Sequence, residues 1–351
     1  MLNKVLGSDD WSVTSETIVA VLALSIAESM MPASKFSWMT HVLGLECLFA
    51  SQGPLAAEDR NPLDQALLDL CRPLMILVSF FTRKPSLMSE PGWQIVKQSQ
   101  GSDQGACWFQ SSVAGFDLSF LMGILAELPA LFLQCDDCVR IAITKSCPQP
   151  LADVSMIWSR VRQLQQDLQA WEASSDYSGQ EKVIGNKPLQ EVDPTLANDV
   201  GWTTVFSFKD MEHAATFNMY HTVIILLTSI PIALLEAGLF DLHPSDFSIW
   251  NDNLGSASQS LSFKVEKSVH SICRSIEYYI YVQEPIRPPA DYYIFFPIHV
   301  ARRATLRMTL SQELAFLTDA HKRMKSRYPT GVWANMDLNN RFSGYQEGLF
   351  G

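Results

Sequence analysis

Apolar residues recur every three or four positions through most of this chain, which is the pattern of amphipathic helices. The clearest run alternates at three and four residues for almost three heptads and consists of Val154, Ile157, Val161, Leu164, Leu168 and Trp171. Such a run is typical of a dimeric coiled coil or of one helix in a bundle, and its short length favours the bundle. Alternating runs between hairpin turns, which would indicate strands, are absent from the sequence. We therefore predict an all-α fold, either a multi-helix bundle or an irregular α-solenoid-like arrangement.

Polar stretches divide this helical pattern into parts. The predicted parts are a polar lead at 1–14, an all-helical domain at 15–328 and a mobile, Gly-containing tail at 329–351. Within the domain, residues 174–200 are rich in Ser, Asp, Gly, Asn and Pro and are predicted to form a long loop. That loop would join two helical halves, 15–173 and 201–328, and we expect both halves to pack together. Residues 243–262 are predicted to be a second, mostly loop-like segment.

Prolines interrupt several of the apolar runs. Because proline lacks the backbone N–H that a helix interior uses, Pro73 is expected to kink or break a helix, and Pro129 and Pro231 are expected to break one. Residues 15–31 are almost entirely apolar, and we predict a helix that is buried on most sides and ends at Pro32. Residues 223–240 approach the length of a membrane span, but Pro231 and Glu236 interrupt them. We interpret that stretch as a broken core helix, which predicts a soluble chain that does not enter a membrane.

A helical hairpin is predicted over residues 36–93. Its first helix, from about 35 to 50, carries an apolar stripe of Trp38, Val42, Leu45 and Phe49 and is stopped by Gly53-Pro54. Asn61-Pro62 is expected to open the second helix, with Asn61 as the N-cap and Pro62 at the first helical position. The predicted buried side of that helix consists of Leu63, Leu67, Leu70 and Leu74.

The hairpin also carries a series of motifs in a particular order. Trp38 and His41-x-x-Gly44 come first, Gly53-Pro54 follows, and Glu90-Pro91-Gly92-Trp93 closes the series. This order resembles the central regulatory domain of fungal zinc-cluster (Zn2Cys6) transcription factors, whose pattern is W-x-x-H-x-x-G, then R-G-P, then E-P-x-W. Gln52 stands where that pattern has Arg, which weakens any charge-pair role at the turn.

Three later segments extend the resemblance over most of residues 15–325. They are Asn218–His221, Ile272–Tyr278 and Tyr293–Arg302. The resemblance implies a nuclear protein that regulates transcription of a metabolic or secondary-metabolite gene set. It implies protein partners, either the transcription machinery or a DNA-binding factor. It also implies a domain that restrains or relays activation and that sometimes senses a small-molecule effector, for which the aromatic-rich core (19 Phe, 9 Trp and 9 Tyr) offers material.

The DNA-binding zinc cluster of that family has no counterpart in the sequence. The cluster needs six closely spaced cysteines, whereas the seven cysteines here are dispersed at 47, 71, 107, 135, 138, 147 and 273. Cys135-x2-Cys138 with Cys147 supplies only three thiols, so no metal site is predicted. The net charge of −11 repels a phosphate backbone. We therefore expect no direct nucleic-acid binding by this chain alone.

Catalytic motifs are also missing, so we predict no enzyme activity, no catalytic residues and no cofactor. Asp136-Asp137 begins a segment like the diphosphate-binding motif of isoprenoid cyclases, but Arg140 occupies the place of its third carboxylate, and Asn251-Asp252 lacks the partners of the second motif. We interpret His41 and His299 as structural, and His213 and His221 as too far apart for one metal ion.

Basic residues gather near the end of the helical pattern: Arg302, Arg303, Arg307, Lys322, Arg323, Lys325 and Arg327. We interpret them as a solvated surface that balances nearby acids, with nuclear import or an acidic partner as the alternative.

These observations predict a regulatory domain of the zinc-cluster type without its DNA-binding module. The alternative is a stand-alone interaction protein that modulates a complete factor, with a possible homodimer through residues 154–171. An uncatalogued helical enzyme is a third and weaker interpretation.

Overall fold

The structure is a computed structural model. It describes residues 13–30, 37–54, 61–93, 113–144, 150–175, 177, 180–183, 204–239, 257–281 and 292–327. Helices dominate these residues: α2 (Ser15–Met30), α3 (Ser37–Gln52), α4 (Pro62–Thr82), α5 (Val113–Thr144), α6 (Pro150–Ser174), α8 (Met211–Glu236), α9 (Ala257–Tyr281), α10 (Tyr292–Met308), α11 (Ser311–Arg327) and the short 3₁₀ helix η1 (Leu87–Ser89). The predicted all-α fold is confirmed.

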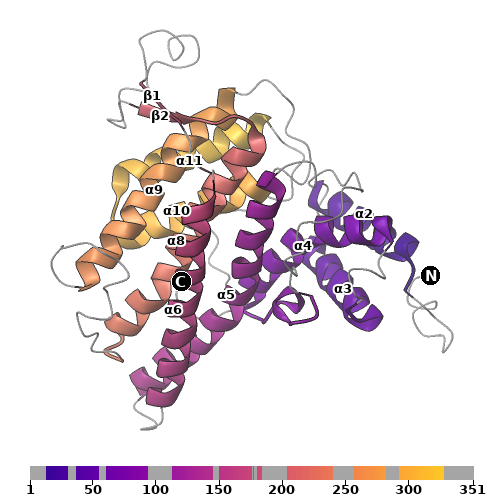
Figure 1. Cartoon of the computed structure of the whole chain (residues 1–351), viewed down its shortest axis with the longest axis horizontal. Coiled ribbons are helices and arrows are strands. Elements are labelled where there is room, and N and C mark those ends of the chain that lie inside the picture. The colour runs from indigo at the N-terminus through magenta and orange to yellow at the C-terminus, as the bar shows by residue number, and fades with distance from the viewer. Residues whose placement is uncertain are drawn as a thin grey trace.

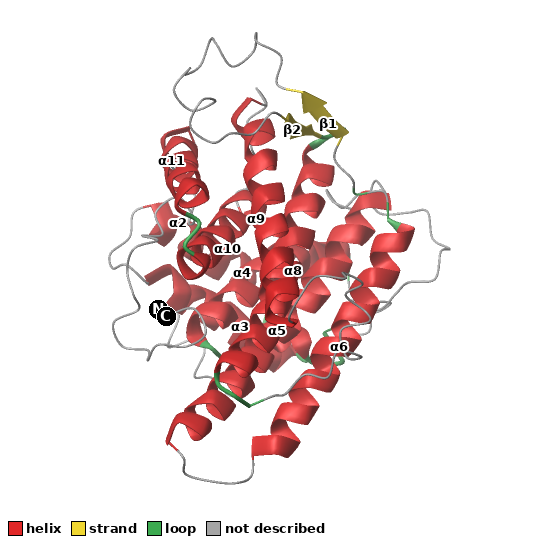
Figure 2. Cartoon of the chain, turned by 90° about the vertical axis from the view of Figure 1, so that its left-hand side faces the viewer, coloured by secondary structure: helices red, strands yellow, loops and turns green. Residues whose placement is uncertain are grey.

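Helix α8 is the centre of the arrangement. It packs against α5, α6, α9 and α10, and side chains are buried along nearly its whole length. Figures 1 and 2 show α5, α6, α9 and α10 beside α8, with α11 packed on α9 and α10, and Figure 1 shows α2, α3 and α4 as a smaller group of helices to one side. One continuous cluster of buried apolar residues runs from α2 to α11.

The predicted hairpin is present, with boundaries close to those expected. Gly53 follows α3 with φ of 76°, a left-handed conformation that glycine adopts without strain. The Asn61 side chain accepts a hydrogen bond from the Asp64 backbone N–H (2.8 Å), and Pro62 is the first residue of α4. The stripe of Trp38, Val42, Leu45 and Phe49 is buried.

The helix breaks predicted at prolines are wrong. Helices α4, α5 and α8 run through Pro73, Pro129 and Pro231, and α10 contains Pro297. Each proline removes one backbone hydrogen bond, but the helix on both sides of it buries apolar side chains. That packing outweighs the lost bond, because tertiary burial supplies most of a helix's stability in a folded protein.

The predicted burial of α2 is wrong, and one residue of the predicted buried side of α4 is exposed, while the rest of that side is buried or half-buried. Helix α2 packs mainly on α3, so Val19, Leu24 and Ile26 remain 44%, 46% and 41% exposed, and the predicted burial on most sides is wrong. Leu63, at the start of α4, is 55% exposed. Apolar composition predicted the helix at 15–31 but could not tell which of its sides would find a neighbour.

A small sheet interrupts the predicted loop at 174–200. Strand β1 (Gln180–Val183) pairs antiparallel with β2 (Thr204–Ser207), in a register that sets Gln180 opposite Ser207. The sequence analysis missed both strands because four residues are too few for a two-residue period to appear. Residues 257–262, predicted as loop, belong to α9. The lead at 1–12 and the tail at 329–351 lie outside the described residues.

Three described helical segments, 62–82, 118–142 and 211–236, are long and apolar enough to cross a membrane by length and composition alone. Within this structure 83% of the apolar window in α8 is buried, since the neighbouring helices cover it.

Candidate functional site

A buried polar network joins α8 to α9. The Asn218 amide donates hydrogen bonds to the Ala214 carbonyl (3.0 Å) and to the Tyr279 hydroxyl (3.1 Å), and its Oδ1 accepts one from the Ser275 hydroxyl (2.5 Å). Asn218 is 2% exposed and Tyr279 is 1% exposed. A buried amide is stable only when its donors and acceptors are paired, and both N–H groups and the oxygen of Asn218 are paired here.

His221 lies one turn beyond Asn218, facing the same pair of helices. Its Nδ1 is 3.4 Å from the Ser268 hydroxyl, and its ring meets the Phe217 ring edge-on at 4.5 Å. Burial, reinforced by the positive charge of Lys267, lowers the pKa of His221 to about 3. The imidazole is therefore neutral at physiological pH.

Aromatic rings surround this network on the side of α6 and β2. Tyr220 contacts the Trp171 ring (5.7 Å) and the Tyr177 ring (4.6 Å). Phe217 contacts Phe206 of β2 (4.8 Å) and Phe208 just after it (5.1 Å). The pairs come from four separate segments of the chain, so the cluster fastens α6 and β2 to α8.

Two phenols of this cluster point toward one carboxylate at the surface. The Tyr177 hydroxyl donates to Glu172 Oε1 (2.9 Å), and the negative charge of Glu172 also acts on the Tyr220 hydroxyl. Burial raises the pKa of both tyrosines far above the ordinary value of a phenol. Both phenols therefore stay protonated and act as hydrogen-bond donors rather than as bases.

The motifs of the N-terminal hairpin meet in a second cluster. A Cβ on Gly92 would lie 2.6 Å from the Pro54 ring, so the turn after α3 and the turn after η1 touch through a glycine that has no room for a side chain. Trp93 is 4% exposed and meets Phe49 edge-on at 6.1 Å, and its carbonyl accepts a hydrogen bond from buried Arg72 (3.1 Å).

Further polar contacts hold η1 against α3. The Leu87 backbone N–H donates to Glu46 Oε1 (2.8 Å), and burial raises the pKa of Glu46. Gly44, by contrast, makes only ordinary contact with Val21 of α2, because an added Cβ would be 3.9 Å from that side chain. Gly92 rather than Gly44 is therefore the glycine that this packing requires.

The histidines single out no reaction centre among the described residues. His41 is half-buried on α3, and His213 pairs with Asp210, the N-cap of α8 (2.7 Å). His299 on α10 packs beside Phe81 (6.3 Å), and burial lowers its pKa to about 3. His270, which the sequence analysis did not weigh, joins α9 to Glu313 of α11 (2.9 Å).

No group of three metal-ligating side chains occurs in the described part of the chain. Cys135 and Cys138 are buried free thiols, and burial raises the pKa of Cys135 to about 12. A thiol at that pKa stays protonated at physiological pH. Cys147 and Asn251-Asp252 lie outside the described residues, while Asp137 pairs with Arg140 (2.6 Å).

The predicted basic cluster is divided among separate contacts. Arg302 donates to Thr318 (3.2 Å), Arg307 pairs with Glu236, and Arg323 pairs with Asp319 (2.8 Å). The pairs of Arg307 and Arg323 agree with a surface that balances nearby acids, whereas Arg302 is buried and was wrongly assigned to that surface. The side chains of Lys325 and Arg327 are outside the described set.

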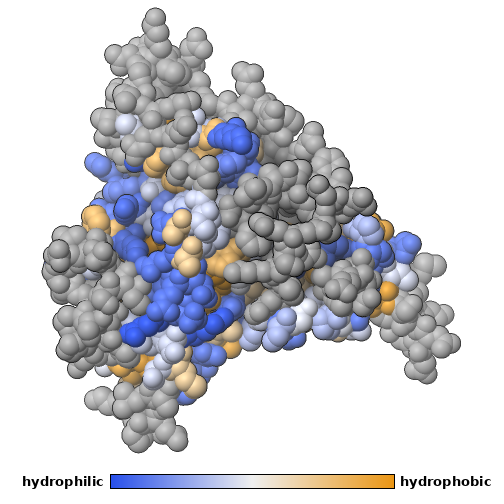
Figure 3. Space-filling view, viewed as in Figure 1, coloured by the Kyte–Doolittle hydropathy of each residue, from blue (hydrophilic) through white to orange (hydrophobic). Residues whose placement is uncertain are grey.

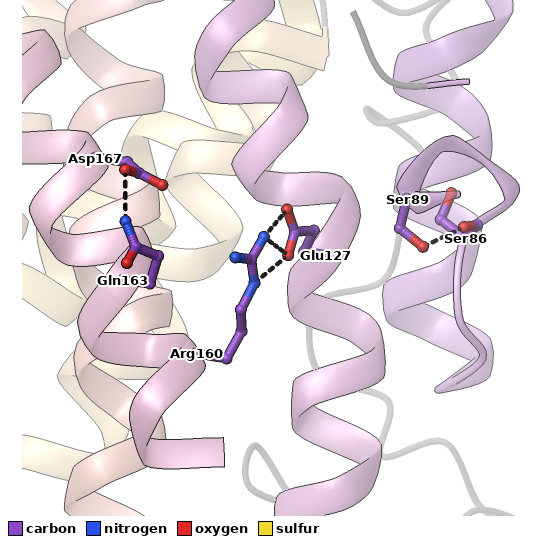
Figure 4. A network of polar contacts seen from close by, with 6 residues as sticks. All are labelled: Ser86, Ser89, Glu127, Arg160, Gln163 and Asp167. Carbon is purple, nitrogen blue, oxygen red and sulfur yellow. Dashed lines mark hydrogen bonds and ion pairs between the residues drawn. The ribbon is translucent and has the colours of Figure 1, made fainter. Parts of the chain in front are cut away.

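The heptad run faces inward. All six of its residues are at most 5% exposed within one chain: Val154, Ile157, Val161, Leu164, Leu168 and Trp171. The exposed side of α6 is mostly polar, with Met156 as an exposed apolar residue, and Figure 3 shows a largely blue surface where α6 lies in Figure 1. On that side, in Figure 4, Arg160 binds Glu127 of α5 through two nitrogens (2.7 and 2.6 Å), and Gln163 lies next to Asp167. The run therefore behaves as one helix of a bundle.

Comparisons with protein families, with curated proteins and with solved structures find no match to this chain. The resemblance to zinc-cluster factors therefore stays a prediction based on motifs.

Sequence reasoning located the segments of these clusters but not their most constrained residues. It quoted Asn218–His221 and Ile272–Tyr278 separately, and the structure brings them together through Asn218 and Ser275. It missed the contacts of Arg274, Phe206 and Tyr177. A buried asparagine inside an otherwise apolar helix was the available indication, since a core position retains a polar side chain only where partners exist.

Proposed function

We propose that this chain is a regulatory domain of the fungal zinc-cluster type that controls transcription in the nucleus, in a metabolic or secondary-metabolite setting, through protein partners. The supporting observation is that the motifs behind the resemblance make specific pairwise contacts. Gly92 packs on Pro54, and Asn218 bonds to Ser275. Motif residues that pack on one another fit a unit retained as a whole rather than a chance collection of core patterns.

A transcription reporter tests this proposal. The full chain, fused to an unrelated DNA-binding domain, is expected to change reporter output several-fold relative to that domain alone. Gly92→Val, which forces a side chain into the Pro54 ring, should remove the change, whereas Arg140→Gln at the exposed surface should keep it. A nuclear, folded fusion that leaves the reporter unchanged would refute the proposal.

The alternative, an interaction protein that modulates a complete factor, draws support from one observation. Val19 and Ile26 lie two turns apart on one side of α2 and are 44% and 41% exposed, which gives this helix an exposed apolar edge of the kind that binds partners. Dimerisation through residues 154–171 is disfavoured, because the apolar residues of that segment are already buried against other helices of the same chain.

The interpretation of residues 154–171 as a dimer interface can be tested directly. Substituting Val161 and Leu164 together by Asp should unfold the chain, since both positions are at most 2% exposed. Folded monomers from this double variant would restore the dimer interpretation.

A further inference from the structure

A short strap covers the aromatic end of α8 and α9. It consists of Tyr177 and of Thr204–Phe208, which includes β2. A two-stranded sheet is only marginally stable by itself in water, so β1 and β2 depend on what they pack against. That support comes from the helices: Arg274 of α9 on one side and the aromatic rings of α6, α8 and α9 on the other.

Among the described residues, three contacts link Arg274 to the outer part of the strap. Its Nε donates to the Thr204 carbonyl (3.1 Å), its Nη2 donates to the Thr204 hydroxyl (2.5 Å), and its Cζ lies 4.3 Å from the centre of the Phe206 ring. Phe206 also contacts the Phe217 ring at 4.8 Å. The strap therefore presents one aromatic ring and two neighbouring oxygen acceptors to the helices. An aromatic carboxylate or carbonyl compound carries the same groups.

The strap is anchored unequally along its length. Phe208 is 8% exposed and is held by Phe217 (5.1 Å) and Tyr278 (5.2 Å, edge-on). Residues 204–207 are only half-buried, so the place filled by Thr204 and Phe206 borders on solvent. The outer part can therefore lift while Phe208 keeps the strap attached.

We propose that Thr204 and Phe206 occupy, as an internal substitute, a binding site for a small aromatic carboxylate or carbonyl compound, which displaces the outer strap and pairs with Arg274. A carboxylate has an advantage over the Thr204 oxygens, because a charge-assisted hydrogen bond to a guanidinium is stronger than one to a neutral acceptor. This inference rests on the proposed function in that it names the class of effector that the regulatory domain would sense.

The tethered strap competes with any free ligand. Its effective concentration at the site is in the millimolar range or above, as for other short intramolecular connections, so a small probe binds the wild type weakly. Removing the Phe206 ring removes the aromatic part of the competitor and leaves Thr204, Arg274 and Phe217 in place. The variant should therefore bind more tightly than the wild type.

Benzoate is the test probe, measured by calorimetry on the full chain. Phe206→Ala should bind it at least about tenfold more tightly than the wild type does. The double variant Phe206→Ala with Arg274→Gln should lose that gain. Phe81→Ala, which removes a half-buried ring on α4, is the matched control and should behave as the wild type. Phe206→Leu, which keeps an apolar strap, replaces Phe206→Ala if circular dichroism shows that the alanine variant is unfolded.

Hydrogen exchange measures the displacement itself. Saturating benzoate should speed amide exchange at residues 204–207 of the wild type without changing α10 or α11. Equal benzoate binding by Phe206→Ala and by the double variant, equal binding of acetate and benzoate, or no binding by any variant would overturn the proposal. Because these measurements need no transcription, benzoate binding combined with a silent reporter would refute the proposed function and leave this site standing.

Discussion

The α3–α4 hairpin and the α8–α9 pair are both buried, but different forces fix their geometry. The hairpin relies on shape: Gly92 lies against the Pro54 ring with no room for a Cβ, and the stripe on α3 contains only apolar side chains. The α8–α9 pair relies on matched polar groups around Asn218. Shape tolerates substitutions that conserve volume, whereas a buried network requires its partners, so the two regions should respond to opposite kinds of change.

The largest effect is expected from creating a cavity in the hairpin. Leu45 is fully buried, and Leu45→Ala should lower the free energy of unfolding by about 2–5 kcal/mol. Leu45→Met keeps the volume and should cost less than about 1.5 kcal/mol. Urea unfolding of the two variants measures the difference, and equal losses would show that volume is not what matters at this position.

In the α8–α9 pair, a change that keeps a similar volume should be costly. Asn218→Leu removes the hydrogen bond to the Tyr279 hydroxyl and one of the two acceptors of the Ser275 hydroxyl, which keeps the Ile272 carbonyl, at about 1–3 kcal/mol for a buried group left unpaired. Adding Ser275→Ala to Asn218→Leu should recover part of the loss, because both ends of one bond are then apolar. The same urea experiment measures this coupling, and strictly additive losses would contradict it.

A third comparison uses two glycines. Gly92→Ala should destabilise the chain by about 1–3 kcal/mol, because the new Cβ overlaps the stiff Pro54 ring. Gly123 lies inside α5 with open space where its Cβ would be, so Gly123→Ala should stabilise by up to about 1 kcal/mol. Thermal unfolding of both variants should therefore give shifts of opposite sign.

Acid should weaken the α8–α9 pair through His221. Its pKa is about 3 in the folded protein, well below the ordinary histidine value near 6.5, so between these values the unfolded chain binds a proton that the folded chain does not. Stability is then complete above about pH 6.5 and falls as the pH drops toward 3, by about 1 kcal/mol per such histidine between pH 7 and 5.5. Unfolding of His221→Gln over the same range should show a shallower dependence, and an unchanged slope would remove His221 as a cause.

The smallest effect is expected on the outer face of α2. Val19→Glu and Leu24→Glu should each change stability by no more than about 0.5 kcal/mol, because both side chains are exposed. Size-exclusion chromatography of the double variant should match the wild type. A larger loss, or a change in elution, would reveal that another surface covers this face in solution.

Sequence reasoning reached the parts of this fold that depend on nearby residues. Asn61 and Pro62 predicted the start of α4, because capping involves residues within one turn. Pro231 misled it, since whether a helix survives a proline depends on neighbours from α5, α9 and α10 that a local pattern does not contain. The strap was not predicted for the same reason. Thr204 is held by Arg274, which lies seventy residues further along the chain.

The pairing of β1 with β2 has a further consequence for how the protein can be divided. The first half of the chain supplies α2 to α6 and β1, the second supplies β2 and α8 to α11, and α8 packs into the first half. A chain cut between 183 and 204 would yield two fragments whose exposed apolar surfaces fit only each other. Produced separately, the two fragments would reassemble on mixing, and β1 of one would pair with β2 of the other.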